Sequence, residues 1–286
     1  MPEDSHKTEL PLDRTRGAAA KSHMLRRLAI GGVVIGTAIV AVLASSRLAG
    51  TKSVPPSSDE TGFQPPGALI VAPEERSATD PLAITTYNAI AAQVASDTIG
   101  IFAFPESLTP TSVLSRTNEH GVPQTFLVLE VRKGWARVML PGPPNGSTGW
   151  IRTSEVNFYG VEHVVRVRLA SKRLEVWERG RLAFSFPAGI GRKNTPTPGG
   201  RYYIKELLQP TDPAGPWGSY AFGLNGYSNS VYGPDGEPQV IGIHGTNEPD
   251  SVGKEVSAGC VRLRNEDIEK LVGLLPLGTP VEIMED

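Results

Sequence analysis

Cysteine is almost absent from this chain of 286 residues, which contains only Cys260. A single cysteine excludes an internal disulfide framework, a cysteine-rich zinc site and an iron–sulfur cluster. An excess of one charge sign is also lacking, because 28 Lys and Arg residues oppose 30 Asp and Glu residues and leave a net charge of −2. This balance provides no basic field for a nucleic-acid partner, so we expect none.

Long hydrophobic runs are lacking as well, with one exception near the N-terminus. Residues 28–44 carry no charge and directly follow a pair of arginines. A run of this length is just enough to cross a bilayer, and the arginines predict a cytoplasmic tail over 1–27. We therefore expect a single-pass membrane helix at 28–46, with the rest of the chain extracytoplasmic. The alternative is a signal peptide cleaved after Ala44, which gives a secreted form.

Glycine and proline are abundant instead, at 31 and 25 residues. They disfavour a helical bundle and predict a turn-rich, mainly β protein. A Pro- and Ser-rich stretch over 47–80 predicts a disordered linker. After it we expect a small β barrel over 81–157 and a larger β unit over 158–286. A short helix is expected where Pro81 opens an apolar pattern of helical spacing that runs to Val94.

Apolar runs between turns, and alternating apolar and polar residues, predict the strands of both units. The predicted strands are 99–104, 125–131, 135–140, 149–151, 163–169, 172–178, 182–187, 202–204, 240–244 and 281–283. One late helix is predicted at 265–275, because its apolar residues share a face. Asn265 is expected to cap that helix.

Cys260 is the candidate nucleophile of the second unit. A free cysteine is most often a small buried hydrophobe. Here it follows Ala258 and Gly259, small residues that let backbone N–H groups approach a ligand closely. His244 lies sixteen residues upstream, at the end of an apolar strand. Because a histidine can supply and stabilise a thiolate, the sequence predicts a Cys–His pair for nucleophilic catalysis.

The other parts of such a site follow from the same chemistry. No Asp or Asn is placed to hold the second ring nitrogen of His244, so the neighbouring carbonyl of Gly245 is the candidate. The backbone N–H groups of Ala258, Gly259 and Cys260 are candidate donors to an oxyanion. One histidine and one cysteine fall short of four metal ligands, so we expect no metal and no cofactor.

Four segments of the second unit form an ordered set of motifs. They are TPTPGGRY at 195–202, GPWG at 215–218, IHGTN at 243–247 and VSAGCVRL at 256–263. Together they resemble the YkuD-type L,D-transpeptidases, whose signature is S/T-H-G-C-[IV]-R-[LM] preceded by a histidine motif, and whose domain is a β-sandwich or barrel. Ala258 stands where the family usually has histidine, and alanine keeps the backbone N–H that is the expected contribution there.

That resemblance implies acyl transfer on peptidoglycan stem peptides in cell wall biogenesis. Cys260 attacks the carbonyl of the third stem residue, releases the terminal D-alanine and forms a thioester, which the side-chain amine of another stem resolves. The resemblance also implies inhibition by carbapenems. Ser257 is expected to shape the loop or contact substrate. Arg262 is either a partner for a substrate carboxylate or thiolate, or part of a structural ion pair.

The resemblance further implies a lid over the cleft, formed by residues 209–237. Its aromatic residues are candidate substrate contacts or anchors of the lid to the core, namely Trp217, Tyr220, Tyr227 and Tyr232.

Two other functions stay open. Water in place of the second stem would make the protein an L,D-carboxypeptidase or endopeptidase. A non-catalytic cell-wall binding protein is the third hypothesis, because Ala258 departs from the signature. The runs GWARV at 134–138 and GWI at 149–151 resemble bacterial SH3-like domains. Trp135 and Trp150 in these runs form either a ligand platform or part of a core.

Overall fold

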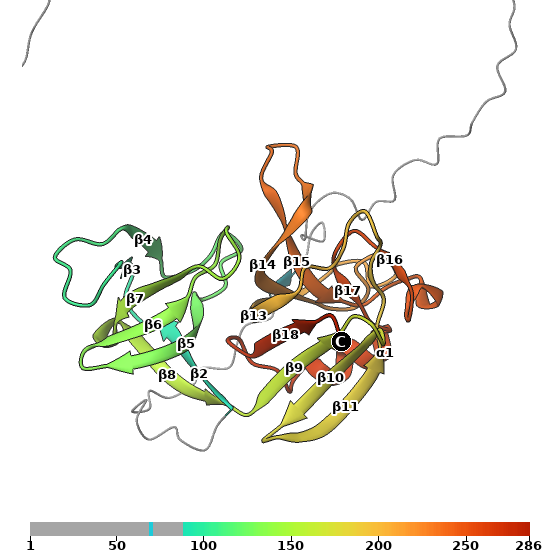
Figure 1. Ribbon diagram of the computed structural model, residues 1–286, viewed down its shortest axis with the longest axis horizontal. Coiled ribbons are helices and arrows are strands. Elements are labelled where there is room, and N and C mark those ends of the chain that lie inside the picture. The colour runs from blue at the N-terminus through green and yellow to red at the C-terminus, as the bar shows by residue number, and fades with distance from the viewer. Residues whose placement is uncertain (1–68, 71–87) are drawn as a thin grey trace, which may run out of the picture. The chain divides into compact units, whose positions relative to one another are not determined.

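The computed structural model describes Leu69–Ile70 and residues 88–286. These residues are mainly β, with one late α-helix, as the sequence predicts (Figure 1). The expected cytoplasmic tail and the membrane helix at 28–46 lie outside the described residues, as does nearly all of the linker at 47–80. Within the described ranges, no helix has both the length and the apolar character needed to cross a membrane.

Residues 88–161 form what we call the small sheet unit. It consists of a five-stranded antiparallel sheet in the order β7-β6-β5-β2-β8 and a two-stranded β3–β4 pair. An isolated bridge between Phe102 and Trp150 joins the end of β3 to β7. The elements are β2 (Ala89–Val94), β3 (Thr98–Ile101), β4 (Ser112–Ser115), β5 (Thr125–Arg132), β6 (Trp135–Met139), β7 (Thr148–Arg152), the 3-10 turn η3 (Thr153–Glu155) and β8 (Val156–Val161).

The predicted early helix is wrong over residues 89–94, which form the strand β2. This strand pairs with β5 on one side and β8 on the other. Ala91 and Ala92 are both fully buried, on opposite faces, in two different apolar clusters. A strand buried on both faces loses the alternation that marks a strand in the sequence, so its apolar residues fall at helical spacing by accident. The start predicted at Pro81 lies outside the described residues.

The two tryptophans of the small sheet unit contribute to packing. Trp150 is buried, and the ring of Trp135 meets Phe102 edge-on with centroids 5.0 Å apart. Arg152 covers the rings of both Phe102 and Trp135, and Arg132 lies over Trp150. These contacts support the core alternative for Trp150 and place Trp135 at the margin of the same cluster.

Residues 162–286, the large sheet unit, are built on a nine-stranded sheet in the order β11-β10-β9-β18-β13-β14-β15-β17, with β1 beside β13. The pairs β9–β18 and β15–β17 are parallel. The elements are β1 (Leu69–Ile70), β9 (His163–Arg168), β10 (Arg173–Glu178), β11 (Arg181–Pro187), β12 (Ile190–Gly191), β13 (Gly200–Gln209), β14 (Ala221–Tyr232), β15 (Pro238–His244), the 3-10 turn η4 (Pro249–Ser251), β16 (Glu255–Ser257), β17 (Val261–Arg262), α1 (Asn265–Val272) and β18 (Pro280–Met284).

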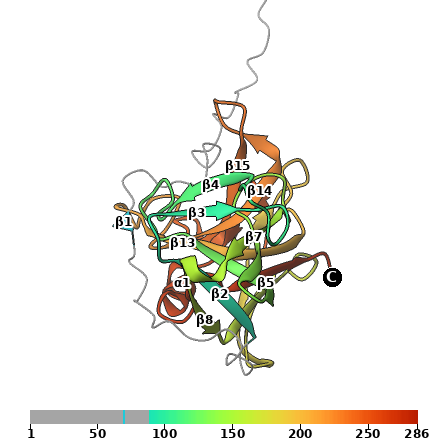
Figure 2. The ribbon, with the colours of Figure 1, turned by 90° about the vertical axis from the view of Figure 1, so that its left-hand side faces the viewer.

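Strand β13 lies between β18 and β14, and its pairing with β14 ends at Ile204, so beyond Leu224 β14 pairs with β15 alone among the described strands. Gly200–Tyr203 pair with β18, whereas the part from Ile204 to Leu208 pairs with β14. Helix α1 closes the core of the unit with Ile268 and Leu271. Beyond Leu224, β14 continues with β15 as a hairpin that projects from the rest of the sheet in both ribbon views (Figures 1 and 2).

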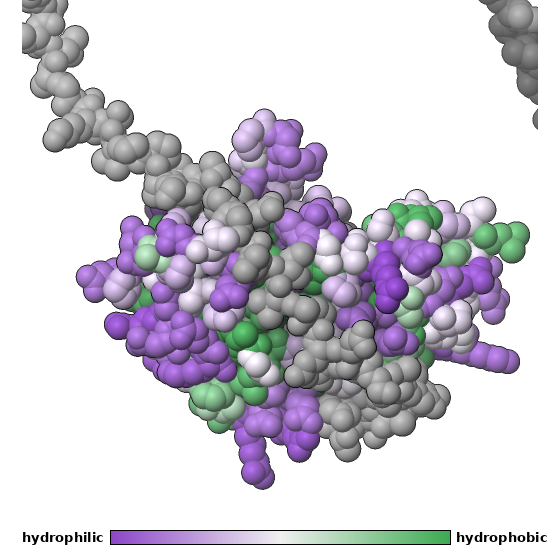
Figure 3. All heavy atoms as spheres, turned by 180° about the vertical axis from the view of Figure 1, so that it is seen from behind, coloured by the Kyte–Doolittle hydropathy of each residue, from purple (hydrophilic) through white to green (hydrophobic). Residues whose placement is uncertain are grey.

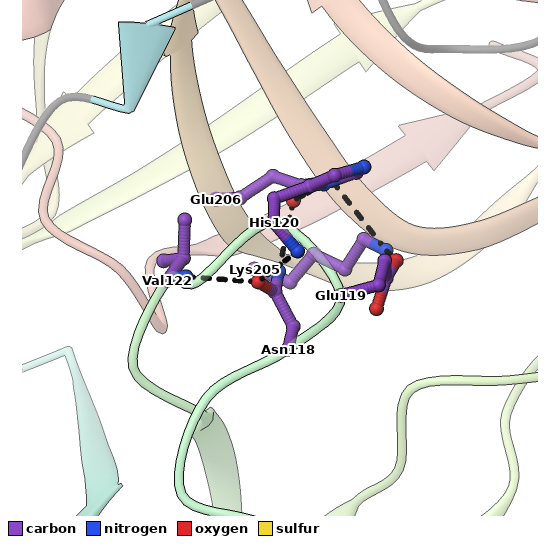
Figure 4. A network of polar contacts seen from close by, with 6 residues as sticks. All are labelled: Asn118, Glu119, His120, Val122, Lys205 and Glu206. Atoms are coloured by element: carbon purple, nitrogen blue, oxygen red, sulfur yellow. Dashed lines mark hydrogen bonds and ion pairs between the residues drawn. The ribbon is translucent and has the colours of Figure 1, made fainter.

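A polar network connects the loop between β4 and β5 to β13 (Figure 4). The carboxylate of Glu206 is fully buried, and it accepts hydrogen bonds from Asn118 at 2.9 Å and from His120 Nδ1 at 2.6 Å. Lys205 Nζ lies 3.4 Å from Glu206 and 3.3 Å from Glu119. A buried carboxylate needs such partners, because desolvation of an unpaired charge is costly. By contrast, the coloured residues on the surface shown in Figure 3 are mainly hydrophilic.

Candidate active site

The parallel pairing of β15 with β17 brings the predicted nucleophile and base into one cleft. His244 is the last residue of β15, and its partner in the register is Arg262. Arg262 lies two positions after Cys260 in the sequence. Both His244 and Cys260 line the cleft, as do Trp217, Ser228, Val231, Gln239, Val240, Ile241, Ser257, Ala258 and Arg262. Residues that are sixteen positions apart in the sequence therefore meet at the edge of the sheet.

The imidazole of His244 is buried and held in one tautomer. Its Nδ1 lies 2.6 Å from the carbonyl oxygen of Gly245, which can only accept, so the Nδ1 proton is donated to it. This confirms the contact predicted from the sequence and leaves the Nε2 lone pair to act as a base. Burial lowers the pKa of His244 to about 4, against a small opposing effect of the Gly245 bond. The ring of Trp217 packs on the imidazole with centroids 4.8 Å apart.

The thiol of Cys260 is protonated at neutral pH. The residue as a whole is half-buried, but desolvation of its sulfur raises the pKa to about 11, although a hydrogen bond with the Gly242 backbone works in the opposite direction. The resting pair is therefore a neutral thiol and a neutral imidazole. Such a pair needs His244 to take the proton as the sulfur attacks, which is general-base activation of the nucleophile.

The loop before Cys260 is fixed by the hydroxyl of Ser257. That hydroxyl donates to the Cys260 carbonyl at 2.6 Å and accepts from the Gly259 N–H at 3.2 Å. Gly259 has a φ of 120°, a conformation that favours glycine. Because Ser257 engages the Gly259 N–H, the N–H groups of Ala258 and Cys260 remain as candidate oxyanion donors. Of the two roles considered for Ser257, the structure supports the loop-shaping one.

The TPTP segment supports the same loop from outside. The hydroxyl of Thr195 donates to the carbonyl of Ser257 at 3.0 Å. The hydroxyl of Thr197 accepts from the Gly191 N–H at 2.8 Å, and a Cβ at Gly191 would lie only 2.3 Å from the Thr197 nitrogen. A motif far from Cys260 in sequence therefore has a structural role at the nucleophile loop.

Asn265 connects three segments of the site, and its predicted role as a helix cap is wrong. It is the first residue of α1, the N-cap is Arg264, and no side chain caps the helix. Its Oδ1 accepts from the N–H groups of Ser219 at 3.2 Å and Thr246 at 3.0 Å. The Nδ2 group faces the Pro213 carbonyl at 3.4 Å. The side chain thus holds the loop that carries Trp217 against the loop that follows His244.

Arg262 forms an ion pair within the chain, although it also lines the cleft. Its guanidinium lies 2.9 Å from the carboxylate of Glu248, and its side chain is buried whereas Glu248 is 66% exposed. Desolvation lowers the pKa of Arg262. This contact supports the structural ion pair among the roles considered for the arginine, and Glu248 is a partner that the sequence did not indicate.

The stretch predicted as a lid is partly a strand. Residues 221–232 form β14, and Ser228 and Val231 of this strand line the cleft. Trp217 is a buried wall residue, and Tyr220 lines a separate hollow beside α1. Tyr232 is 57% exposed and is not part of the cleft wall.

No group of three or more His, Cys, Asp or Glu side chains in the described ranges is arranged to hold a metal ion. The chemistry that the arrangement of residues supports is covalent catalysis by Cys260, with His244 as proton acceptor and donor.

Comparisons with known proteins place residues 162–283 in the sequence profile of the YkuD family, described as L,D-transpeptidase catalytic domain. The putative L,D-transpeptidase YkuD of Bacillus licheniformis is 37% identical over 123 residues, which are 43% of this chain and 66% of that protein. The putative L,D-transpeptidase YkuD of Bacillus subtilis is 34% identical over 125 residues, which are 44% of this chain and 68% of that protein.

Among solved structures, the catalytic domain of an E. faecium L,D-transpeptidase acylated by ertapenem aligns at 19% identity and a TM-score of 0.32, covering 44% of this chain and 99% of that one. The present chain spans about two thirds of the length of the two Bacillus relatives. The sequence match carries the assignment: the chain belongs to the YkuD family of L,D-transpeptidases.

Proposed function

We propose that this protein is a peptidoglycan L,D-transpeptidase that cross-links stem peptides through a thioester on Cys260. The observation that carries the proposal is the placement of Cys260 in one cleft with a neutral His244 whose Nδ1 is fixed by Gly245. Family membership supports the substrate class. The details below are deduced from the residues of the cleft.

The first half-reaction forms the thioester. His244 Nε2 takes the thiol proton while Sγ of Cys260 attacks the carbonyl carbon of the third residue of the donor stem. The oxyanion that develops is stabilised by the candidate N–H donors of Ala258 and Cys260. When the tetrahedral intermediate collapses, the C–N bond to the terminal D-alanine breaks. His244 gives its proton to the leaving amine, so charge and protons balance.

The second half-reaction resolves the thioester. The neutral side-chain amine of another stem attacks the thioester carbon and passes a proton to His244 Nε2. The C–S bond breaks, the imidazolium returns its proton to the sulfur, and the resting thiol and neutral imidazole are restored. The product carries a new amide bond between the two stems.

We expect the β14–β15 hairpin to contact the donor stem, because Ser228 and Val231 of β14 and Gln239, Val240 and Ile241 of β15 line the cleft. The tip of this hairpin carries the exposed Tyr232. Within the predicted lid of residues 209–237, the residues that line the cleft are thus Trp217, Ser228 and Val231.

The first test is intact-protein mass after incubation with a carbapenem, for the wild type and the variants Cys260→Ala and His244→Ala. We expect a single covalent adduct on the wild type, none on Cys260→Ala, and acylation slowed at least a hundredfold in His244→Ala with its circular dichroism unchanged. An unmodified but folded wild type would contradict an activated Cys260 and favour the non-catalytic wall-binding hypothesis.

The second test separates transfer from hydrolysis. The protein is incubated with a tetrapeptide stem as donor and an amine-bearing stem as acceptor, and the products are identified by mass. We expect a cross-linked dimer and free D-alanine. Tripeptide and D-alanine without dimer would make the protein an L,D-carboxypeptidase, with the same thioester resolved by water.

We further propose that the apolar segment at 28–46 anchors the protein in the membrane, with residues 81–157 as an SH3-like spacer domain in front of the catalytic domain at 158–286. The uncharged run and the preceding arginines support the anchor, and the GW motifs support the domain assignment. N-terminal sequencing of the protein from membrane fractions tests this. An N-terminus just after Ala44 would replace the anchor by a cleaved signal peptide.

A further inference from the structure

The small sheet unit is hydrogen-bonded to β14 beside the catalytic cleft. The side-chain amide of Asn145, in the turn between β6 and β7, makes two hydrogen bonds with Tyr227 of β14. Asn145 Nδ2 donates to the Tyr227 carbonyl at 2.8 Å, and Asn145 Oδ1 accepts from the Tyr227 N–H at 2.8 Å. Two residues earlier, Asn225 Nδ2 donates to the Leu140 carbonyl of the same turn region at 3.2 Å.

These bonds fall where β14 has lost its neighbour in the sheet. The last pair of β14 with β13 is Leu224 with Ile204. At Tyr227, opposite Val240 of β15, the N–H and C=O groups of β14 face the open side. The amide of Asn145 satisfies both groups at once, as a neighbouring strand would.

The next residue along β14 belongs to the active site. Ser228 is buried and lines the cleft, and its hydroxyl accepts from the N–H groups of Ser230 and Val231. The register of β14 against β15 shifts on both sides of Tyr227, so no continuous ladder of hydrogen bonds fixes this stretch. The two bonds to Asn145 therefore provide the fixed point from which Ser228 and Val231 are placed.

We propose that Asn145 is a positioning residue for the catalytic cleft, through which the small sheet unit sets the wall formed by the β14–β15 hairpin. It deepens the proposed function and rests on it for the kinetic readout. Asn145 lies 115 positions before Cys260, does not line the cleft and takes no part in the chemistry. Its expected effect is on the binding of the donor stem, because the hairpin carries Ser228 and Val231 of the cleft wall and a displaced wall contacts the stem less well.

The experiment compares Asn145→Ala with Tyr159→Phe in the full chain. Tyr159→Phe is the matched control, because its hydroxyl also bridges the two units, to the Leu277 carbonyl at 2.9 Å, but at a residue outside the cleft wall. The readouts are hydrogen exchange over residues 225–241, and KM and kcat for a donor stem peptide. Two hydrogen bonds of ordinary net strength correspond to a change of about 5- to 150-fold in an opening equilibrium.

In Asn145→Ala we expect exchange over 225–241 to accelerate about tenfold and KM to rise about tenfold, with kcat within twofold of the wild type. Tyr159→Phe should leave both readouts at wild-type values. Unchanged exchange in Asn145→Ala, an unchanged KM, or an equal response of Tyr159→Phe would overturn the proposal.

Two further measurements keep the test decisive. If Asn145→Ala does not fold, Asn145→Asp takes its place, because it keeps the acceptor for the Tyr227 N–H. Asn145→Asp should show an acceleration of hydrogen exchange between those of the wild type and of a full loss of both bonds. No acceleration of exchange would overturn the proposal. If the wild type transfers no stem peptide, the proposed function fails, and the exchange measurement alone decides the role of Asn145.

Discussion

Replacement of Asn265 by alanine should destabilise the protein and disorder the cleft together. The substitution removes the acceptor for the N–H groups of Ser219 and Thr246, at 3.2 and 3.0 Å. Both residues are at least 91% buried, at 9% and 4% exposure, so neither N–H is solvated by bulk water once its acceptor is lost. A buried donor without a partner costs about 1–3 kcal/mol, and water entering the space of the lost amide reduces this cost.

We therefore expect the free energy of unfolding to fall by about 2–4 kcal/mol in Asn265→Ala, from two such donors. Urea denaturation followed by tryptophan fluorescence measures this fall, with an unchanged m-value as the sign that the unfolded state is the same. The carbapenem acylation rate should fall as well, because the loops of Trp217 and His244 lose their common anchor.

Asn265→Asp is the matched variant. It retains an oxygen for both N–H groups, and a carboxylate at the first residue of α1 is favourable at the helix N-terminus. It gives up only the long 3.4 Å contact to the Pro213 carbonyl. Its stability should lie within about 1 kcal/mol of the wild type. An Asn265→Ala protein as stable as the wild type, or an Asn265→Asp protein as unstable as Asn265→Ala, would refute the reasoning.

Three other predictions follow from the same structure. With a thiol pKa of about 11, only about one Cys260 in ten thousand is a thiolate at pH 7. The rate of alkylation by iodoacetamide should therefore rise tenfold per pH unit up to that pKa. A rate that has already reached its plateau at pH 7 would indicate a preformed ion pair with His244. The hydrogen bond to Glu206 raises the pKa of His120 above its usual 6.5. The contribution of this contact to stability is therefore complete below pH 6.5 and is lost as the pH rises through the raised pKa. His120→Gln should flatten that part of the curve of Tm against pH, and an unaltered curve would contradict the network. Gly218→Ala places a Cβ only 2.2 Å from Asn265 Oδ1, on a residue whose φ is 64°. We therefore expect the free energy of unfolding, measured by urea denaturation, to fall by at least about 2 kcal/mol. A denaturation midpoint equal to that of the wild type would contradict the close packing.

Local patterns were sufficient to predict most of the strands and the two reacting residues. The alternation over 163–169 and 172–178 predicts β9 and β10, because each strand has one face on the core and one in solvent. His244 and Cys260 were found because the cleft takes each from a short, continuous motif. In these cases a short stretch of sequence is enough to identify the strand or the reacting residue.

Where tertiary structure overrides local preference, the prediction failed. The run over 221–232 is rich in Gly, Asn and Ser and was assigned to a lid, yet it is a long strand that lies between β13 and β15 in the sheet. Gly226 is required there, because a Cβ would lie 2.5 Å from the ring of Tyr202. The role of Asn265 was missed for a related reason: its partners are backbone groups of segments 19 and 46 residues away, which no local pattern announces.

The position of β17 has a consequence for how the enzyme becomes active as it folds. This strand is only two residues long, but both of its residues are buried, and Arg262 is bridged to Gly189 on the side away from β15. Its release would expose Val261 and Arg262 and leave the backbone groups of both neighbours unpaired, which is costly. Cys260 therefore takes its place together with the core around β15, and we expect catalytic activity to be lost together with that core on heating.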